Sequence, residues 1–184
     1  MRLFLSRFTA FELLLMSIIA ALGVAVKPLV NALSHLISSP LFIPGGALAG
    51  GIYMLFVVLG AALVKKRGAA TLIGVVQAIL ILALGLPGSH GAFSLLTYTA
   101  PGLAIDLLWL SLGHRGCCLF CCFLAGMAAN LTGTLLTNSL FFRLPALFLA
   151  LMLTVALFSG GLGGVAAWRI TKIFQKHRLV DSHD

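Results

Sequence analysis

The stretch Leu86–Gly91, which reads LPGSHG, interrupts a long apolar chain near its middle. Proline, glycine and serine are typical turn residues, so the stretch predicts a break between two helices. It holds one ionisable residue, His90, and apolar runs lie on both sides of it. A helix needs roughly 20 apolar residues to cross a bilayer. The pattern therefore predicts a polytopic membrane protein, and any ligand is expected to meet it here and at the other breaks on the same side.

The composition excludes an ordinary soluble domain. Of the 184 residues, 61% are hydrophobic and 9% are charged, and the mean hydropathy is +1.15. Soluble domains carry about 25% charged residues. A chain of this length has room for about six spans and no soluble domain. The net charge of +8 does not indicate a nucleic-acid partner, because the basic residues sit at the ends of apolar runs, where they set membrane topology.

The predicted fold class is an all-α membrane protein of six transmembrane helices, at about 11–26, 43–64, 68–85, 95–112, 117–137 and 146–168. The first run is too long for a signal-peptide core of roughly 7–15 residues. We expect a turn at Lys27-Pro28 after it. Ten of the twelve Lys and Arg residues fall on one side, which predicts that both termini are cytoplasmic. The breaks at 27–39, 86–93 and 138–145 then face outward.

Polar side chains inside a bilayer are costly and need a partner or a function. Gln77 lies at the middle of the third expected span, where it could serve an interhelical hydrogen bond or a ligand. Asn130, Thr134 and Asn138 recur every four residues and share one face of the fifth. A seam between helices would use the same stripe. Because it opens toward the outer breaks, we favour ligand contact.

Two acidic residues fall inside expected spans. Asp106 shares a face of the fourth span with Thr99 and Gly102, toward the cytoplasmic half. We interpret it as a structural partner of another helix, with ligand contact as the alternative. Glu12 lies near the cytoplasmic end of the first span and is expected to anchor the interface or to pair with a basic residue.

The sequence does not carry the pattern of an enzyme. Ser89 beside His90 is a poor nucleophile and base pair, because a base must reach the nucleophile and be oriented by a third group. The Gly-x-Ser-x-Gly, His-Glu-x-x-His and phosphate-loop motifs are absent from the sequence. Energy for any uptake must then come from a partner or an ion gradient.

The cysteines gather in one segment, as Cys117, Cys118, Cys121 and Cys122. On a helix the two i,i+4 pairs point about 100° apart, which does not suit the four convergent ligands of a tetrahedral metal site. We interpret them as small apolar filler near the cytoplasmic interface, with lipidation or metal binding as alternatives.

Four segments carry a resemblance to a known family: Phe11–Ser17, Lys66–Ala70, Gly85–Pro87 and Gly102–Asp106. With the length and the six-span layout, they resemble the substrate-binding S components of energy-coupling factor (ECF) transporters, in the YkoE-like branch associated with thiamine and its hydroxymethylpyrimidine precursor. The resemblance implies a multi-pass protein of a prokaryotic plasma membrane that takes a vitamin-like solute from outside. It also implies a membrane coupling subunit and a pair of ATPase subunits as partners, toppling of the S component as the mechanism, and no cofactor.

Ala21 and Ala25 form an Ala-x-x-x-Ala motif on the first span. S components use such a motif to dock on the coupling subunit, so the resemblance implies the same role here. Thiamine-type members tend to carry acidic residues along the third span, where this chain has Gly74, Gln77 and Ile81. The outward cations Lys27 and Arg143 likewise favour neutral or anionic solutes.

These observations predict a binding subunit of an ECF-type importer, selective for a vitamin or vitamin precursor. The expected ligand contacts are Gln77, Ser89, His90, Tyr98, Asn130, Thr134 and Asn138, with Lys27 and Arg143 at the outer rim. The first outward break, around Lys27 and Asn31, is the alternative place for the site. A small structural or regulatory membrane subunit without a ligand is the alternative function, and an intramembrane enzyme is the third.

Overall fold

The computed structural model describes residues 7–38, 45–85, 91–113, 116 and 118–176. Regular structure in these ranges is helical, in the order α2 (Ala10–Ser38), α3 (Gly45–Val64), α4 (Ala69–Leu84), η2 (Gly91–Phe93), α5 (Ser94–Leu112), α6 (Leu119–Thr137), η3 (Asn138–Phe142) and α7 (Ala146–Lys176). Within the described part, five helices are long and apolar enough to cross a membrane, and α4 is a shorter apolar helix of 16 residues. The expected break at Ser89 and His90 lies outside the described residues.

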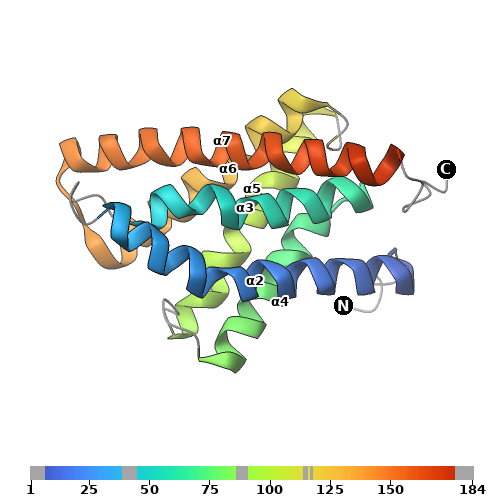
Figure 1. Cartoon of the computed structure of the whole chain (residues 1–184), viewed down its shortest axis with the longest axis horizontal. Helices are drawn as coiled ribbons and strands as arrows, with labels where there is room; N and C mark the ends of the chain where they lie inside the picture. Colours follow the sequence, from blue (N-terminus) through green and yellow to red (C-terminus); the bar gives the residue numbers. More distant parts are fainter. Residues whose placement is uncertain (1–6, 39–44, 86–90, 114–115, 117, 177–184) are drawn as a thin grey trace.

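The bundle is organised around α3. This helix packs against α2, α4, α5, α6 and α7, and α2, α3 and α7 run along the long axis with α4 and α5 crossing behind them (Figure 1). Its central position follows from its sequence, because it contains no charged residue and is rich in small and aliphatic side chains. The main buried cluster gathers here, with Val57 and Val58 of α3 beside Met16, Ile73 and Ile105.

Glycines bring α3 and α6 close to α7. A Cβ added at Gly163 on α7 would collide with the main-chain carbonyl oxygen of Gly51 on α3. A Cβ added at Gly160 on α7 would likewise collide with the carbonyl oxygen of Gly126 on α6. In a membrane, association of helices depends on such close packing, because lipid tails are as apolar as the side chains. The glycine-rich runs of the sequence are therefore the surfaces through which α7 joins the bundle.

The expected turn at Lys27-Pro28 is wrong, because α2 continues as helix through Pro28 to Ser38. Proline removes one main-chain N–H, yet membrane helices tolerate it where neighbouring groups satisfy the freed carbonyl. The last helix is also longer than expected and ends at Lys176. The continuation of α2 matters for the candidate site, because it keeps Lys27 within a helix that packs in the bundle.

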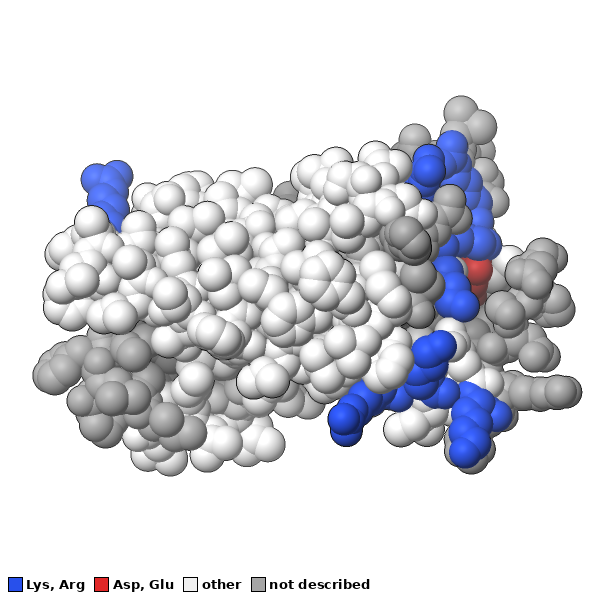
Figure 2. All heavy atoms as spheres, turned by 90° about the horizontal axis from the view of Figure 1, so that it is seen from above, with Lys and Arg blue, Asp and Glu red and all other residues white. Residues whose placement is uncertain are grey.

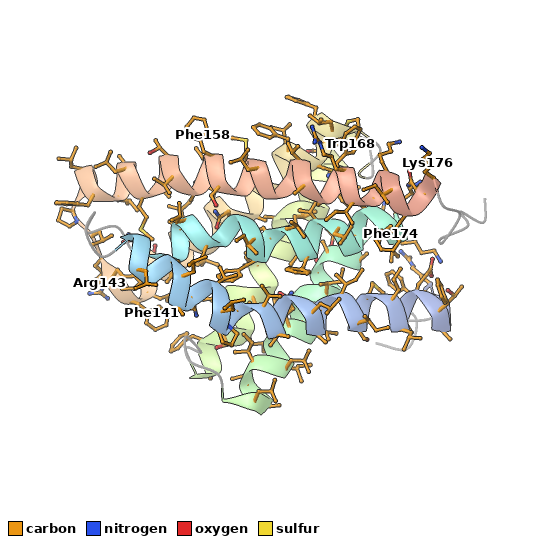
Figure 3. The ribbon with its side chains drawn as sticks, in the orientation of Figure 1. Phe141, Arg143, Phe158, Trp168, Phe174 and Lys176 are labelled. Carbon is orange, nitrogen blue, oxygen red and sulfur yellow. A yellow bond between two sulfur atoms is a disulfide. The ribbon has the colours of Figure 1, made fainter. Side chains whose placement is uncertain are left out.

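The charges gather at one end of the molecule. Lys and Arg side chains cover that end, a wide uncharged belt follows, and a cation stands at the opposite end (Figure 2). The opposite cation is Arg143, and Lys176 marks the basic end (Figure 3). Within the basic end, Lys66 forms an ion pair with Glu12 at 2.7 Å. Glu12 also accepts the main-chain N–H of Thr9 at 2.7 Å, as in a capping box at the start of α2.

Asp106 ties α5 to the start of α4. Its carboxylate accepts the main-chain N–H groups of Gly68 (3.2 Å) and Thr71 (2.8 Å), and the hydroxyl of Thr71 at 2.6 Å. The first N–H groups of a helix lack partners within the helix and carry partial positive charge. A carboxylate from the neighbouring helix supplies both an acceptor and a negative charge, so Asp106 acts as the cap of α4 in this structure.

The cysteine segment differs from the expected apolar filler. Cys118 and Cys121 are joined in a disulfide at the start of α6, and Cys122 is buried. The indole N–H of Trp109 donates to the carbonyl of Cys121 at 3.1 Å, so the segment also anchors α5. Cys117 lies outside the described residues. Among the residues that the structure describes, no three His, Cys, Asp or Glu side chains lie together as a metal site would need.

Candidate functional site

Lys27 is a buried cation between two aromatic rings. Its side chain is 5% exposed, and Nζ lies 3.5 Å from the ring centroid of Tyr98 on α5 and 5.4 Å from that of Tyr53 on α3. An ammonium over an aromatic face is attracted by the ring's quadrupole. The expected position of Lys27 at an outer rim is therefore corrected. It lies inside the bundle because α2 does not turn at Pro28.

Asn31 and Tyr53 extend this group toward the end of α2. The Tyr53 hydroxyl donates to Oδ1 of Asn31 at 2.6 Å, and Asn31 lies one helical turn beyond Lys27. Tyr53 was not among the ligand contacts predicted from the sequence. One signal was available, because Tyr53 is a rare polar-tipped aromatic in an otherwise apolar span, and such residues usually find a partner when buried.

Gln77 approaches the same face of α2 from α4. It is 3% exposed, and its Nε2 atom has no hydrogen-bond partner among the described residues. The amide lies against Gly23, where an added Cβ would strike it. Gly23 precedes Lys27 by four residues, so both face the same side of α2. We call Lys27, Asn31, Tyr53, Gln77 and Tyr98 the Lys27 cluster.

The cluster joins four helices that are distant in sequence. Lys27 and Asn31 come from α2, Tyr53 from α3, Gln77 from α4 and Tyr98 from α5. Small pockets for ligands are mostly apolar with a few placed polar groups that fix orientation. The cluster brings together a cation, an amide donor and two ring faces inside the bundle.

The polar side chains of the α6 stripe hydrogen-bond mainly to main-chain groups. Asn130 is 3% exposed, and its Nδ2 donates to the carbonyls of Ala47 (3.2 Å) and Ala156 (2.8 Å). The Asn138 side chain accepts the N–H of Leu144 at 3.0 Å. Thr134 is buried as well. These contacts hold α3 and α7 on α6, and a direct ligand contact from the stripe stays a prediction.

Of the remaining expected residues, those that the structure describes lie outside the cluster. Ser89 and His90 are outside the described residues. Arg143 is exposed in the turn between η3 and α7, at the end of the molecule opposite to the basic end (Figure 3). Ala21 and Ala25 are exposed on α2, and large apolar side chains beside them are exposed too, including Ile18 and Leu22. This outer strip of α2 is free of charge.

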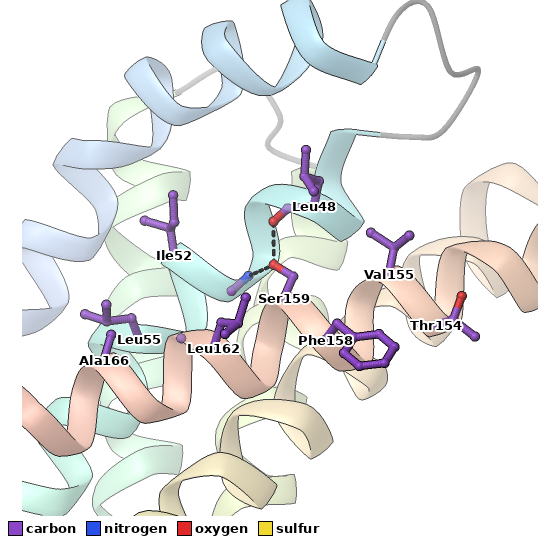
Figure 4. Close-up of a pocket in the computed structure, with 11 residues that line it drawn as sticks. Leu48, Ile52, Leu55, Thr154, Val155, Phe158, Ser159, Leu162 and Ala166 are labelled. Carbon is purple, nitrogen blue, oxygen red and sulfur yellow. Dashed lines mark hydrogen bonds between the residues drawn. The ribbon is translucent and has the colours of Figure 1, made fainter.

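A concave surface lies between α3 and α7, with a volume of about 580 Å³ (Figure 4). Leu48, Ile52, Phe158 and Leu162 line it with other small and apolar groups. Its polar atoms are engaged, since the Ser159 hydroxyl donates to the carbonyl of Leu48 at 2.5 Å and accepts the N–H of Gly51 at 3.0 Å. The groove is therefore mainly apolar, whereas the Lys27 cluster contains a cation and several polar groups.

Comparison with solved structures places this architecture among the S components of ECF transporters. One such structure, "Crystal structure of an S-component of ECF transporter", matches with a TM-score of 0.80 and 21% sequence identity, over 94% of this chain and 88% of the other. Residues 11–132 match the family model described as "ABC-type cobalt transport system, permease component", and the chain belongs to that family. The protein is therefore a multi-pass membrane protein of a transport family. A comparison with curated protein sequences found no match.

Proposed function

We propose that this protein is the substrate-binding S component of an ECF-type importer. Family membership and the shared fold support this role, as does a buried polar cluster in which Nε2 of Gln77 has no hydrogen-bond partner among the described residues. We further propose six spans, with α4 as the short third one, and both termini in the cytoplasm of a prokaryotic cell. The asymmetry of Lys and Arg seen in Figure 2 supports that orientation.

The observation that carries the proposal is the buried Lys27 beside Tyr98, together with the Nε2 atom of Gln77, which has no hydrogen-bond partner in the described part of the chain. Polar groups at membrane depth are expensive, and a ligand that pairs with them accounts for their presence. Lys27 lies 17 residues beyond the start of α2 at the basic end, about 26 Å along the helix at roughly 1.5 Å per residue. A hydrocarbon core is about 30 Å thick. In the proposed orientation, the Lys27 cluster thus lies in the outer half of the membrane.

The proposed solute is a vitamin or vitamin precursor with a ring. Tyr53 and Tyr98 offer ring faces, and Lys27 and Gln77 offer hydrogen-bond donors. The resemblance to YkoE-like proteins makes hydroxymethylpyrimidine the first neutral solute to test. In this proposal Ser89 and His90 contribute from the outward connection between α4 and η2, Arg143 stands at the outer rim, and Asn130, Thr134 and Asn138 chiefly support the wall.

The proposed partners are a membrane coupling subunit and a pair of ATPases. The chain would dock on the coupling subunit through the uncharged strip of α2 that contains Ala21 and Ala25, since small residues allow close helix approach. ATP hydrolysis by the partners would drive toppling and release of the solute inside.

The test is uptake in cells or proteoliposomes that contain this chain with a coupling subunit and two ATPases. The solutes are hydroxymethylpyrimidine, thiamine, ring-containing carboxylate vitamins and Co²⁺, which the family description names as cargo. We expect ATP-dependent accumulation of a ring-containing solute that needs this chain. Accumulation of Co²⁺ alone, or no uptake of any solute, would contradict the proposal.

A further inference from the structure

We propose that Lys27 is the counter-ion for a carboxylate of the transported solute, so that the substrate class is a small ring-bearing monocarboxylate. This inference rests on the proposed function, because it assigns a substrate class to the same site. It starts from the position of Lys27, whose side chain is 5% exposed within a helix of a membrane bundle.

The chain provides Lys27 with no carboxylate of its own among the described residues. The sequence contains four acidic residues. Glu12 pairs with Lys66, and Asp106 caps α4 at Gly68 and Thr71, both at the basic end. The other two follow Lys176 in the sequence, beyond the last described helix. A buried ammonium without a partner of opposite sign is costly, and a bound carboxylate would supply that partner.

The ammonium of Lys27 disfavours a cationic solute beside the two tyrosine rings. Two tyrosine faces could form a cage for a ligand cation, but Nζ of Lys27 already lies 3.5 Å from the centroid of Tyr98. A second cation in this place would meet like charge in a medium of low dielectric constant. The same lysine therefore attracts an anion and repels a cation, which makes it the determinant of charge selectivity.

The number of positive charges favours a carboxylate over a phosphate. Lys27 is the buried cation of the described cluster, and Arg143 is exposed at the end of the molecule. A phosphate monoester carries about −1.5 to −2 charges near pH 7, and one ammonium balances only a single unit. A ring-bearing monocarboxylate would place its charge at Lys27 and its ring against Tyr53 or Tyr98. Nε2 of Gln77 on α4, which lies against Gly23 one turn before Lys27 on α2, would donate to an acceptor atom of the solute.

The experiment compares acids with their neutral amides on the purified full chain in nanodiscs. The probes are nicotinate with nicotinamide, 4-aminobenzoate with 4-aminobenzamide, and biotin with its amide, together with hydroxymethylpyrimidine and thiamine. Binding is measured by titration calorimetry, and solutes that co-purify are identified by mass spectrometry. We expect a carboxylate to bind at least about tenfold more tightly than its amide, since a hydrogen bond to a charged group is worth about 10- to 150-fold.

Variants assign the preference to Lys27. Lys27→Met should abolish the preference for the acid, Lys27→Arg should retain it, and Lys172→Met, at an exposed position on α7, should behave as wild type. Thermal unfolding shows whether Lys27→Met folds; if it does not, Lys27→Gln takes its place, and the comparison of acid with amide on wild type still decides. An amide that binds as tightly as its acid, or binding of only hydroxymethylpyrimidine or thiamine, would overturn this inference and leave the proposed function standing. A chain that binds none of the probes and carries no co-purified solute would overturn both.

Discussion

Asp106 on α5 accepts two hydrogen bonds from Thr71 on α4, one from its main-chain N–H and one from its hydroxyl, at 2.8 and 2.6 Å. The carboxylate thus replaces the missing intrahelical partners at the start of α4. This contact makes Asp106 a structural residue of the bundle, at the end of the molecule away from the proposed solute site.

We expect Asp106→Leu to destabilise the protein by about 1–3 kcal/mol or more, because it leaves the N–H groups of α4 without an acceptor. Asp106→Asn should cost less, since the amide keeps one acceptor oxygen. Thermal unfolding monitored by size-exclusion chromatography compares the two variants. Equal melting temperatures for both, with solute affinity lost in both, would move Asp106 into the site.

Gly163 on α7 should tolerate no side chain, because its Cβ would collide with the carbonyl oxygen of Gly51 on α3. Overpacking of this kind costs typically about 1–3 kcal/mol. We expect a clear fall in the melting temperature of Gly163→Ala. Gly46→Ala is the matched control, because an added Cβ there has nothing within 4 Å. Equal stability of the two variants would argue against the α3–α7 contact.

Ala21→Trp and Ala25→Trp should each reduce co-purification with the coupling subunit and leave solute binding intact. Both positions are exposed on α2, and a bulky residue there blocks close helix approach. Leu107→Trp, at an exposed position on α5, is the control. Full assembly of both alanine variants would remove the docking role from this strip.

Single introduced cysteines test the proposed orientation in a background that lacks the native four. An impermeant thiol reagent applied outside intact cells should label Arg143→Cys and spare Lys66→Cys and Lys172→Cys, because Arg143 lies at the end opposite to the basic one. If the external reagent labelled Lys66→Cys and not Arg143→Cys, the orientation would be the reverse of the proposed one.

The sequence predicted the helical bundle well where span ends carry clear signals. The ends of α3, α4 and α5 lie within two residues of the expected ranges 43–64, 68–85 and 95–112. Basic residues and glycines mark these ends. The predicted start of the first break, at Lys27, was wrong. Lys27-Pro28 resembles a span end locally, but packing of α2 against α3 keeps the segment helical.

The site was harder to predict, since it depends on contacts between distant segments. Gln77 and Tyr98 were expected as ligand contacts from their depth and type. The structure places Tyr98 over Lys27 and Gln77 against Gly23, one turn before Lys27 on α2, and their contact with a ligand stays a prediction. Tyr53 was missed because its relation to Lys27 and Asn31 needs the packing of α3 on α2. The disulfide of Cys118 and Cys121 was missed because spacing on an ideal helix does not describe a helix start, where Cys118 has an extended main chain.

The most direct test of the central claim counts the small molecules that the purified protein carries. Mass spectrometry of the intact complex in nanodiscs, after growth in medium with mixed vitamins, gives the occupancy for each variant. We predict close to one bound ring-containing solute per wild-type chain and at least a tenfold lower occupancy in Tyr98→Ala, with Leu103→Ala, exposed on the same helix, unchanged. A wild-type chain without a bound solute, or equal occupancy in Tyr98→Ala, would contradict the account.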